Sequence, residues 1–211
     1  MPLTIRGCLM DRQDALFPQM EVRPTQPEPR GFRYREDIVT EEEEATLVSS
    51  LEQLELKPFE FQGHLGNRRV VSFGLKYDYG RRAVEQASAI PAFLDDLLVR
   101  VAEFAGLDPD AFRQVGVNEY RPGAGIGWHK DKAQFGIVVG VSLLAPAIMR
   151  FRWADGARWN RISHTLKPRS IYLLSGESRT EWEHSIPPQT NLRYSVTFRT
   201  LSEGGGMIGA A

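Results

Sequence analysis

Residues 192–199, LRYSVTFR, decide the fold. Apolar and polar side chains alternate along this stretch, as they do on a strand that separates two environments. One face holds Leu192, Tyr194, Val196 and Phe198, and the other holds Arg193, Ser195, Thr197 and Arg199. In an ordinary sandwich the polar face meets solvent, whereas in a barrel-like fold it lines a polar interior. In such an interior the polar face could provide a fixed positive charge that binds a dicarboxylate ligand.

Further β-rich segments, separated by Pro or Gly, fill the second half of the chain. They cover 114–120, 137–144, 148–153, 162–167, 170–174 and 192–201, and an earlier segment covers 68–77. Two helices with one apolar stripe each are predicted before residue 107. The first begins at Thr40 with Glu43 as its capping-box partner, and the second runs from Pro91 to a stop at Gly106. Helices followed by strands predict an α+β domain built on a sandwich or jelly roll, with the helices in support.

The length of 211 residues fits one domain with a sizeable core. Residues 1–30 lack sustained periodicity and end in a proline-rich run, which predicts an extended N-terminal arm. Residues 202–211 contain three consecutive glycines, which predict a flexible tail. The working domain is therefore expected to cover residues 31–201.

The composition is that of an ordinary globular domain. There are 26 basic and 27 acidic residues, so that the chain has no overall basic excess that would indicate a nucleic-acid or membrane partner. The single Cys8 can form no intramolecular disulfide, and no apolar run approaches the roughly 20 residues of a membrane span. We expect a cytoplasmic protein without a membrane segment, and no obligate protein partner is evident.

Two of the four histidines lie in informative settings. His129 and Asp131 are two residues apart, so that on an extended segment both side chains point to the same face. His184 follows at a distance, in the sequence Trp182-Glu183-His184. Two imidazoles and one carboxylate would make the facial triad of non-haem Fe(II) oxygenases, which leaves coordination positions open. The alternative is a set of polar surface residues; His164, in an apolar alternation, is expected to be a core histidine.

The order of these motifs resembles the AlkB family of Fe(II)- and 2-oxoglutarate-dependent dioxygenases. The order is Asn118-x-Tyr120, His129-x-Asp131, His184 and then the strand from Arg193 to Arg199. The resemblance is dense over 112–201 and thinner over 31–111. It implies a double-stranded β-helix, or jelly roll, with an N-terminal helical extension.

The resemblance assigns roles residue by residue. It implies that His129, Asp131 and His184 bind Fe(II), and that they are both the metal-binding and the catalytic set. It also implies that Asn118 and Tyr120, which share a strand face, donate hydrogen bonds to the cosubstrate 2-oxoglutarate.

The two arginines of the polar strand would act at opposite ends of the cosubstrate. By the resemblance, Arg193 pairs with the distal carboxylate, a contact that suits the planar guanidinium. Arg199 lies six residues further on, about 20 Å along a strand, and is therefore placed near Asp131 and the other carboxylate. Ser195 and Thr197 complete the cosubstrate set, although Ser195 stands where the family has Asn and reaches less far.

The activity implied by the resemblance is decarboxylation of 2-oxoglutarate by O2 to succinate and CO2, coupled to hydroxylation of a substrate C–H bond. The cofactor supplies the difficult chemistry. Hydroxylation of an N-methyl group would release formaldehyde. We expect demethylation of an alkylated DNA or RNA base; the alternatives are the same chemistry on a protein or small molecule, and a non-catalytic jelly-roll binding module.

Charge distribution favours nucleic acid over the other substrates. Residues 62–82 hold five basic residues against one acid, residues 147–170 hold six against one, and residues 36–60 hold nine acids against one base. Aromatic residues lie among the basic ones, a combination that single-stranded nucleic acid recognition uses. The candidate substrate contacts are Arg68, Arg69, Phe73, Tyr77, Trp128 and Arg161. A basic surface without function is the alternative, and Ala133 replaces an acid that several nucleic-acid-repairing relatives carry.

Overall fold

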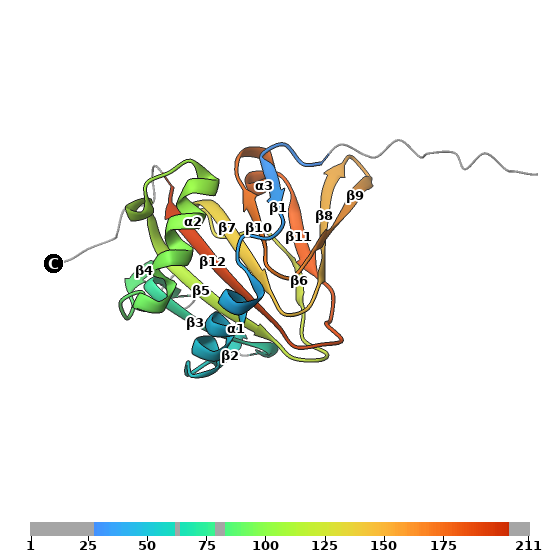
Figure 1. The fold of residues 1–211 in the computed structure, drawn as a ribbon. Coiled ribbons are helices and arrows are strands. Elements are labelled where there is room, and N and C mark those ends of the chain that lie inside the picture. Colours follow the sequence, from blue (N-terminus) through green and yellow to red (C-terminus); the bar gives the residue numbers. More distant parts are fainter. Residues whose placement is uncertain (1–27, 62–63, 79–82, 203–211) are drawn as a thin grey trace, which may run out of the picture.

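The computed structural model describes residues 28–61, 64–78 and 83–202, and its core is a pair of facing antiparallel sheets (Figure 1). The larger sheet has the order β1 (Phe32–Arg35), β10 (Ser170–Leu174), β7 (Phe135–Leu143), β12 (Arg193–Leu201), β5 (Phe112–Tyr120), β3 (His64–Asp78) and β2 (Lys57–Phe61), with β4 (Ala83–Gln86) paired to β3. The smaller sheet has the order β6 (Ile126–His129), β11 (Glu183–Ile186), β8 (Ala147–Asp155) and β9 (Arg158–Leu166). The predicted α+β jelly roll is confirmed.

All seven predicted strands are confirmed, β10 with the predicted bounds and the other six with shifted ends, whereas β1, β2, β4, β6 and β11 were not predicted as strands. Each of these five is four or five residues long and shows little periodic pattern; β10, also five residues long, was predicted because four of its five residues are apolar or aromatic. Their strand conformation is imposed by pairing with neighbours in the sheets.

The two predicted helices are confirmed. α1 (Glu41–Glu52) begins with the predicted capping box: Glu43 N donates to Thr40 Oγ1 at 3.2 Å, and Thr40 N donates to Glu43 Oε2 at 2.8 Å. A 3-10 turn, η1 (Ala92–Leu94), precedes α2 (Asp95–Ala105), which Gly106 ends with a φ of 72°. Two further short elements are η2 (Pro109–Ala111) and α3 (Gly176–Thr180).

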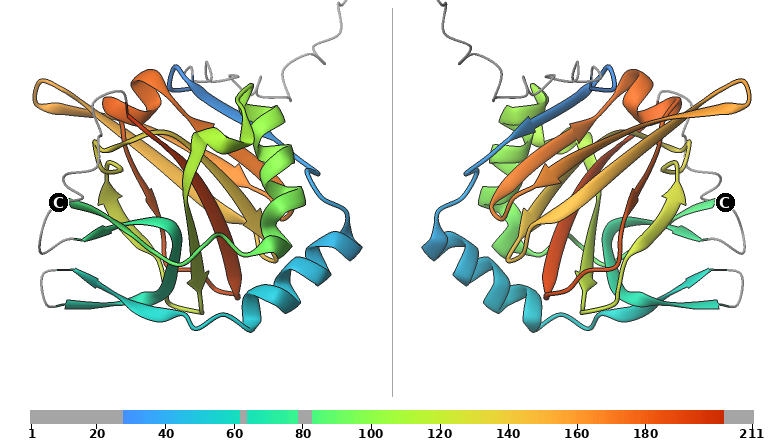
Figure 2. Two further views of the ribbon diagram at one scale, coloured as in Figure 1. Left: turned by 90° about the vertical axis from the view of Figure 1, so that its left-hand side faces the viewer. Right: turned by 90° about the vertical axis from the view of Figure 1, so that its right-hand side faces the viewer.

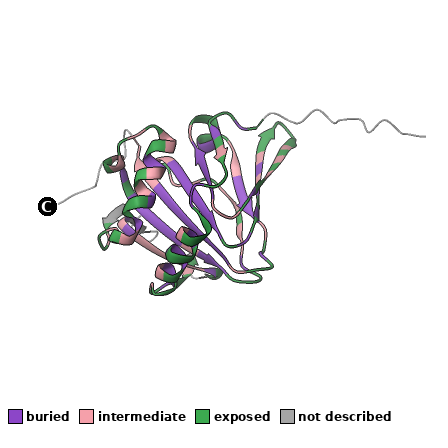
Figure 3. Cartoon of the chain, viewed as in Figure 1, coloured by how far each residue is buried: buried purple, intermediate pink, exposed green. Residues whose placement is uncertain are grey.

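Both helices cover the outer face of the larger sheet (Figures 1 and 2). Their buried side chains, Leu51 and Val101 among them, join one core cluster with the sheet residues Val117, Val196 and Phe198. Figure 3 shows the consequence: the central strands are buried, while the helices are exposed on their far side.

The inner face of the larger sheet is polar at its centre. In the strand register Ser195 lies opposite Asn118 on β5 and Ser142 on β7, and Thr197 lies opposite Gly116 and Gly140. Residues in register share a face, so that the polar side of β12 looks toward the smaller sheet. The polar interior expected from residues 192–199 is therefore present.

A second apolar cluster closes one end of the space between the sheets. It includes Phe32, Met149, Phe151 and Leu174. His164 packs at the margin of this cluster, with ring centroids 5.1 Å from Phe32 and 4.3 Å from Tyr34, but its side chain is 21% exposed, so that the core-histidine prediction is confirmed only in part.

The predicted arm and tail lie largely outside the described residues, which begin at 28 and end at 202. The last residues of the predicted arm contact the barrel: Glu28 Oε1 lies 3.0 Å from His164 Nδ1. Within the described part of the chain, no helix is long and apolar enough to cross a membrane.

The outer face of the larger sheet also buries one carboxylate. Glu119 accepts hydrogen bonds from Arg69 Nη1 at 3.1 Å, Arg121 Nε at 2.8 Å and the Tyr194 hydroxyl at 3.1 Å. We expect Glu119→Ala to lower the free energy of unfolding by about 3 kcal/mol, because it leaves the buried Tyr194 hydroxyl without its acceptor and removes the ion pair with the part-buried Arg69. Arg121→Ala is the control, since that side chain is 61% exposed and should cost under about 1 kcal/mol. Equal losses in urea denaturation would contradict this account.

Candidate metal centre and cosubstrate cavity

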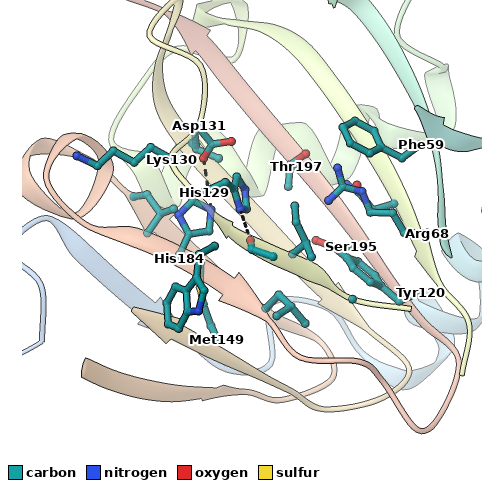
Figure 4. A pocket seen from close by; sticks show the side chains of 18 of the residues that line it. Phe59, Arg68, Tyr120, His129, Lys130, Asp131, Met149, His184, Ser195 and Thr197 are labelled. Atoms are coloured by element: carbon teal, nitrogen blue, oxygen red, sulfur yellow. Dashed lines mark hydrogen bonds and ion pairs between the residues drawn. The ribbon is translucent and has the colours of Figure 1, made fainter. Parts of the chain in front are cut away.

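The three predicted metal ligands converge at the edge of the smaller sheet (Figure 4). His129 on β6 and His184 on β11 are register partners, with ring centroids 4.3 Å apart. Asp131 follows β6 and places Oδ2 3.7 Å from His184 Nε2. One ligand atom from each of the three residues lies within 4.8 Å of the others. The geometry therefore gathers two imidazoles and a carboxylate on one face.

The protonation states suit a divalent cation. Burial lowers the pKa of both imidazoles, that of His184 to about 3, so that both are neutral at pH 7. Burial alone would raise the pKa of Asp131, but the charge of Arg199 and the neighbouring histidines outweigh it and hold the pKa at about 2. Neutral imidazoles and an ionised carboxylate are the forms that bind metal.

Two further observations support a metal at this point. His129 Nδ1 lies 2.9 Å from the Gly127 carbonyl and donates to it, which leaves the lone pair on Nε2. Asp131 Oδ2 is buried and has no hydrogen-bond partner among the described residues. A buried, charged oxygen without a donor is costly unless a cation satisfies it. The residues present fit Fe(II).

Arg179 on α3 was not predicted to act here, yet it holds the segment that carries Asp131. Its guanidinium donates to the carbonyl oxygens of Asp131 at 3.1 Å, of Phe135 at 2.7 Å and of Lys132. The sequence analysis gave this residue no separate role. Its acceptors are backbone carbonyls, which every residue has, so that no residue type in the sequence indicates them.

Arg199 lies at the metal end, where it was predicted. Its Nη2 is 3.6 Å from Asp131 Oδ1, and its Nη1 donates to Gln114 Oε1 at 2.7 Å and Thr197 Oγ1 at 2.9 Å. A Cβ at Gly116 would lie 3.0 Å from Arg199 Nη1, so that the absence of a side chain there makes room for the guanidinium. Gln114 was missed by sequence analysis.

A cavity of about 490 Å³ extends from the metal ligands between the two sheets. Its lining includes all the predicted cosubstrate residues except Arg193: Asn118, Tyr120, Ser195, Thr197 and Arg199. Ser195 and Thr197 point into it in Figure 4. The volume is that of an ordinary small-molecule site.

Arg193 lies beyond the other end of the cavity and is 1% exposed. Its Nε donates to Ser142 Oγ at 3.0 Å, and its guanidinium lies 5.0 Å from the centre of the Tyr120 ring. Nη1 is buried without a hydrogen-bond partner among the described residues. A buried guanidinium that keeps one nitrogen without an acceptor, behind a cavity wall, fits one carboxylate of a dicarboxylate.

Tyr172 on β10 is a cavity residue that the sequence analysis missed. Its ring lies against Gly140, where a Cβ would come within 2.2 Å of it. Burial raises the pKa of Tyr172 to about 12, so that the phenol stays protonated and can donate a hydrogen bond. The sequence signal was Gly140 in the middle of an apolar strand, which marks a close approach.

Two of the six predicted substrate contacts, Arg68 and Trp128, line the cavity. The predictions for Arg69 and Phe73 were wrong, because both belong to the outer face of β3. Arg69 is bound to Glu119, and Phe73 is buried in the core under the helices.

The last two predicted contacts are elsewhere. Arg161 is exposed on β9 and is not among the residues that line the cavity, so that any contact it makes with substrate lies outside the cavity. Tyr77 belongs to β3, and its side chain is outside the described part of the structure.

Comparison with known proteins identifies the family. A family model described as the 2OG-Fe(II) oxygenase superfamily matches residues 31–199. The chain belongs to this superfamily. It is therefore an Fe(II)- and 2-oxoglutarate-dependent dioxygenase, whose cofactors are Fe(II), 2-oxoglutarate and O2.

The curated relatives are AlkB-like. The mouse (Mus musculus) protein named tRNA (carboxymethyluridine(34)-5-O)-methyltransferase ALKBH8 is 30% identical over 170 residues, which cover 76% of this chain and 25% of that protein. The Arabidopsis thaliana protein named alkylated DNA repair protein ALKBH8 homolog is 32% identical over 147 residues, which cover 58% of this chain and 42% of that protein. The chain thus spans about a quarter of the first of these relatives.

A solved structure shares the fold. OsALKBH1 has a TM-score of 0.61 at 17% identity, over 83% of this chain and 99% of that one. At this identity the likeness shows the fold alone.

Removing any metal ligand should abolish iron-dependent turnover of 2-oxoglutarate. His129→Ala, Asp131→Ala and His184→Ala remove a ligand each, and Asp131→Asn removes the negative charge. We expect Mn(II) affinity, measured by calorimetry, to fall at least about tenfold in each variant while circular dichroism stays that of the folded domain. Lys130→Ala is the control within the same motif. Full turnover in any two of the alanine variants would contradict the assignment.

Arg193→Lys should weaken 2-oxoglutarate binding without weakening metal binding. The substitution replaces the planar guanidinium, which can donate two parallel hydrogen bonds to a carboxylate, with the compact ammonium group of lysine. Loss of a buried charge-assisted contact costs on the order of 2 kcal/mol, or about thirtyfold in affinity. Titrations of 2-oxoglutarate and of Mn(II) measure the two affinities separately. An unchanged 2-oxoglutarate affinity would move the anchor elsewhere, with Arg199 the next candidate.

Proposed function

We propose that this dioxygenase oxidises an alkyl group on a nucleic-acid base, and that an N-methyl group so oxidised leaves as formaldehyde. Bound Fe(II), with 2-oxoglutarate and O2, supplies the oxidation of the C–H bond. The chain itself must bind the nucleotide and present its alkyl group beside Asp131 and the two histidines.

The charge of the cavity supports an anionic substrate. Its lining carries Arg68, Lys130, Lys132 and Arg199 against the single acid Asp131. Fe(II) and the 2-oxoglutarate dianion cancel one another's charge, so that this excess persists when both are bound. A phosphate-bearing substrate provides the opposite charge.

The environment of Arg68 is the observation on which the proposal mainly rests. The residue is 8% exposed, its Nε is buried without a hydrogen-bond partner, and its guanidinium lies 3.9 Å from the centre of the Phe59 ring. Figure 4 shows Arg68 and Phe59 together, on the side of the cavity away from His184. A guanidinium held over an aromatic ring offers donors to a base carbonyl or a phosphate.

A second chamber beside the metal supports a separate place for the base. It has a volume of about 350 Å³ and shares Phe59, Arg68, Asp131 and Arg199 with the first cavity. A base that enters from a single strand or from a flipped nucleotide could occupy it while 2-oxoglutarate fills the end near Arg193.

The relatives support nucleic acid as the substrate class. One is named as an alkylated DNA repair protein and another as a tRNA methyltransferase. Because the chain spans about a quarter of the latter, its named methyl transfer is not part of this proposal.

A screen of substrates tests the proposal. The protein is incubated with Fe(II), 2-oxoglutarate and ascorbate, and with methylated single-stranded DNA and RNA oligonucleotides, nucleosides and peptides in parallel. We expect formaldehyde, and a product lighter by one methylene group, from at least one oligonucleotide. Turnover of 2-oxoglutarate with modification of peptides or small molecules only would overturn the proposal.

Arg68→Met should weaken binding of the oligonucleotide by at least about tenfold and reduce the salt dependence of that binding. Each phosphate contact on a single strand contributes about 0.7 to the slope of log affinity against log salt. Arg35→Met removes the same charge from β1, where the guanidinium lies over Phe104 on the helix side of the larger sheet. Equal weakening by both variants would show a long-range charge effect and contradict a direct contact at Arg68.

A further inference from the structure

The outer face of the smaller sheet carries a row of aromatic and guanidinium groups. The inner face of this sheet holds His129, His184 and Phe151. Arg152 is the register partner of Glu183 on one side and of Arg161 on the other, so that these three side chains share the outer face. Figure 2 shows that the hairpin of β8 and β9 projects beyond the body of the molecule.

Arg152 is the centre of this row. Its guanidinium lies 4.6 Å from the centre of the Trp128 ring and 4.3 Å from that of Trp159, and its Nε donates to Glu183 Oε2 at 2.5 Å. Arg150 lies 5.1 Å from the same Trp128 ring. The two tryptophans are therefore held in place by contacts that already exist without a ligand.

The row is open to solvent and positive. Trp159 is 43% exposed, Arg161 is exposed, and Arg150, Arg152 and Arg161 face the single acid Glu183. The described residues offer Arg161 no ion pair. The exposed Trp159 and the half-buried Trp128, beside arginines of which only Arg152 is paired with an acid in the described part of the chain, are a surface for stacked bases and phosphates, whereas a protein partner would favour a more apolar patch.

The row reaches the active-site cavity at β6. Trp128 directly precedes the metal ligand His129, and both Trp128 and Lys130 line the cavity. β6 is an edge strand of the smaller sheet, so that no further strand of that sheet separates the row from the cavity mouth. Four strands at a spacing of about 4.8 Å span about 14 Å, enough for a few stacked nucleotides.

We infer that Trp128, Arg150, Arg152, Trp159 and Arg161 form a platform for the single-stranded flank of the nucleic acid whose modified nucleotide enters the cavity. Bases stack on Trp159 and Trp128, and Arg150 and Arg161 meet the phosphates. The inference rests on the proposed function and adds the path by which the strand crosses the protein.

The hairpin provides matched controls on its opposite face. Trp153 is 39% exposed and lies 6.1 Å from Trp182, ring centre to ring centre; it belongs to the face of Phe151. Arg158 is on the same strand as Arg161 but is the register partner of Asp155. Trp159→Ala is therefore compared with Trp153→Ala, and Arg161→Glu with Arg158→Glu.

The experiment measures the binding of a fluorescein-labelled single-stranded 10-mer by anisotropy at low and at physiological salt. We expect Trp159→Ala and Arg161→Glu each to weaken binding at least about tenfold, and both controls to stay within about twofold of the parent protein. Oxidation of a methylated mononucleotide, too short to reach the platform, should be equal in all five proteins. Matching thermal unfolding curves exclude misfolding as the cause.

The outcomes separate this inference from the proposed function. If all five proteins bind and oxidise the 10-mer equally, the platform is overturned and the proposed function stands. If the parent protein binds and oxidises no oligonucleotide, the proposed function falls and the platform with it. If Trp159→Ala instead dissolves a dimer in gel filtration without changing oligonucleotide binding, the face is an interface between two copies, and the platform is again overturned.

Discussion

The pairing of β12 between β5 and β7 is the constraint on which the rest of the structure depends. It fixes one face of the strand against α1 and α2 and turns the other toward the smaller sheet. A shift of one residue would exchange Phe198 and Arg199 between an apolar core and a charged cavity, at a cost of many buried contacts. The same pairing thus holds the fold together and places Arg193 and Arg199 at the two ends of the cosubstrate site.

Charge compensation at the metal end follows from this arrangement. Asp131 carries the negative charge of the ligand set, while Arg199 and Arg179 approach it from β12 and α3. Arg193 and Arg68 remain with buried nitrogen atoms that lack acceptors among the described residues. The unfavourable burial of these nitrogen atoms is offset when a ligand provides oxygen atoms as hydrogen-bond acceptors. The cosubstrate provides them for Arg193 and, in our proposal, the substrate provides them for Arg68.

The sequence predicted what depends on local spacing. The His129-x-Asp131 motif and the alternation in 192–199 specify faces without reference to other strands, and the structure places both as expected. Arg69 and Phe73 were mispredicted because alternate residues of β3 point to opposite faces of the sheet. The basic and aromatic composition of the segment does not show which of the two sets faces the cavity. Tyr172 and Arg179 were missed because their roles arise only when strands and loops remote in the sequence meet.

A crystal structure of the anaerobic complex with Fe(II) and 2-oxoglutarate tests the central claim most directly. The account predicts the metal bonded to His129, Asp131 and His184, and the distal carboxylate of 2-oxoglutarate within hydrogen-bond distance of the Arg193 guanidinium. A metal bound elsewhere, or 2-oxoglutarate with its distal carboxylate on Arg199, would contradict it.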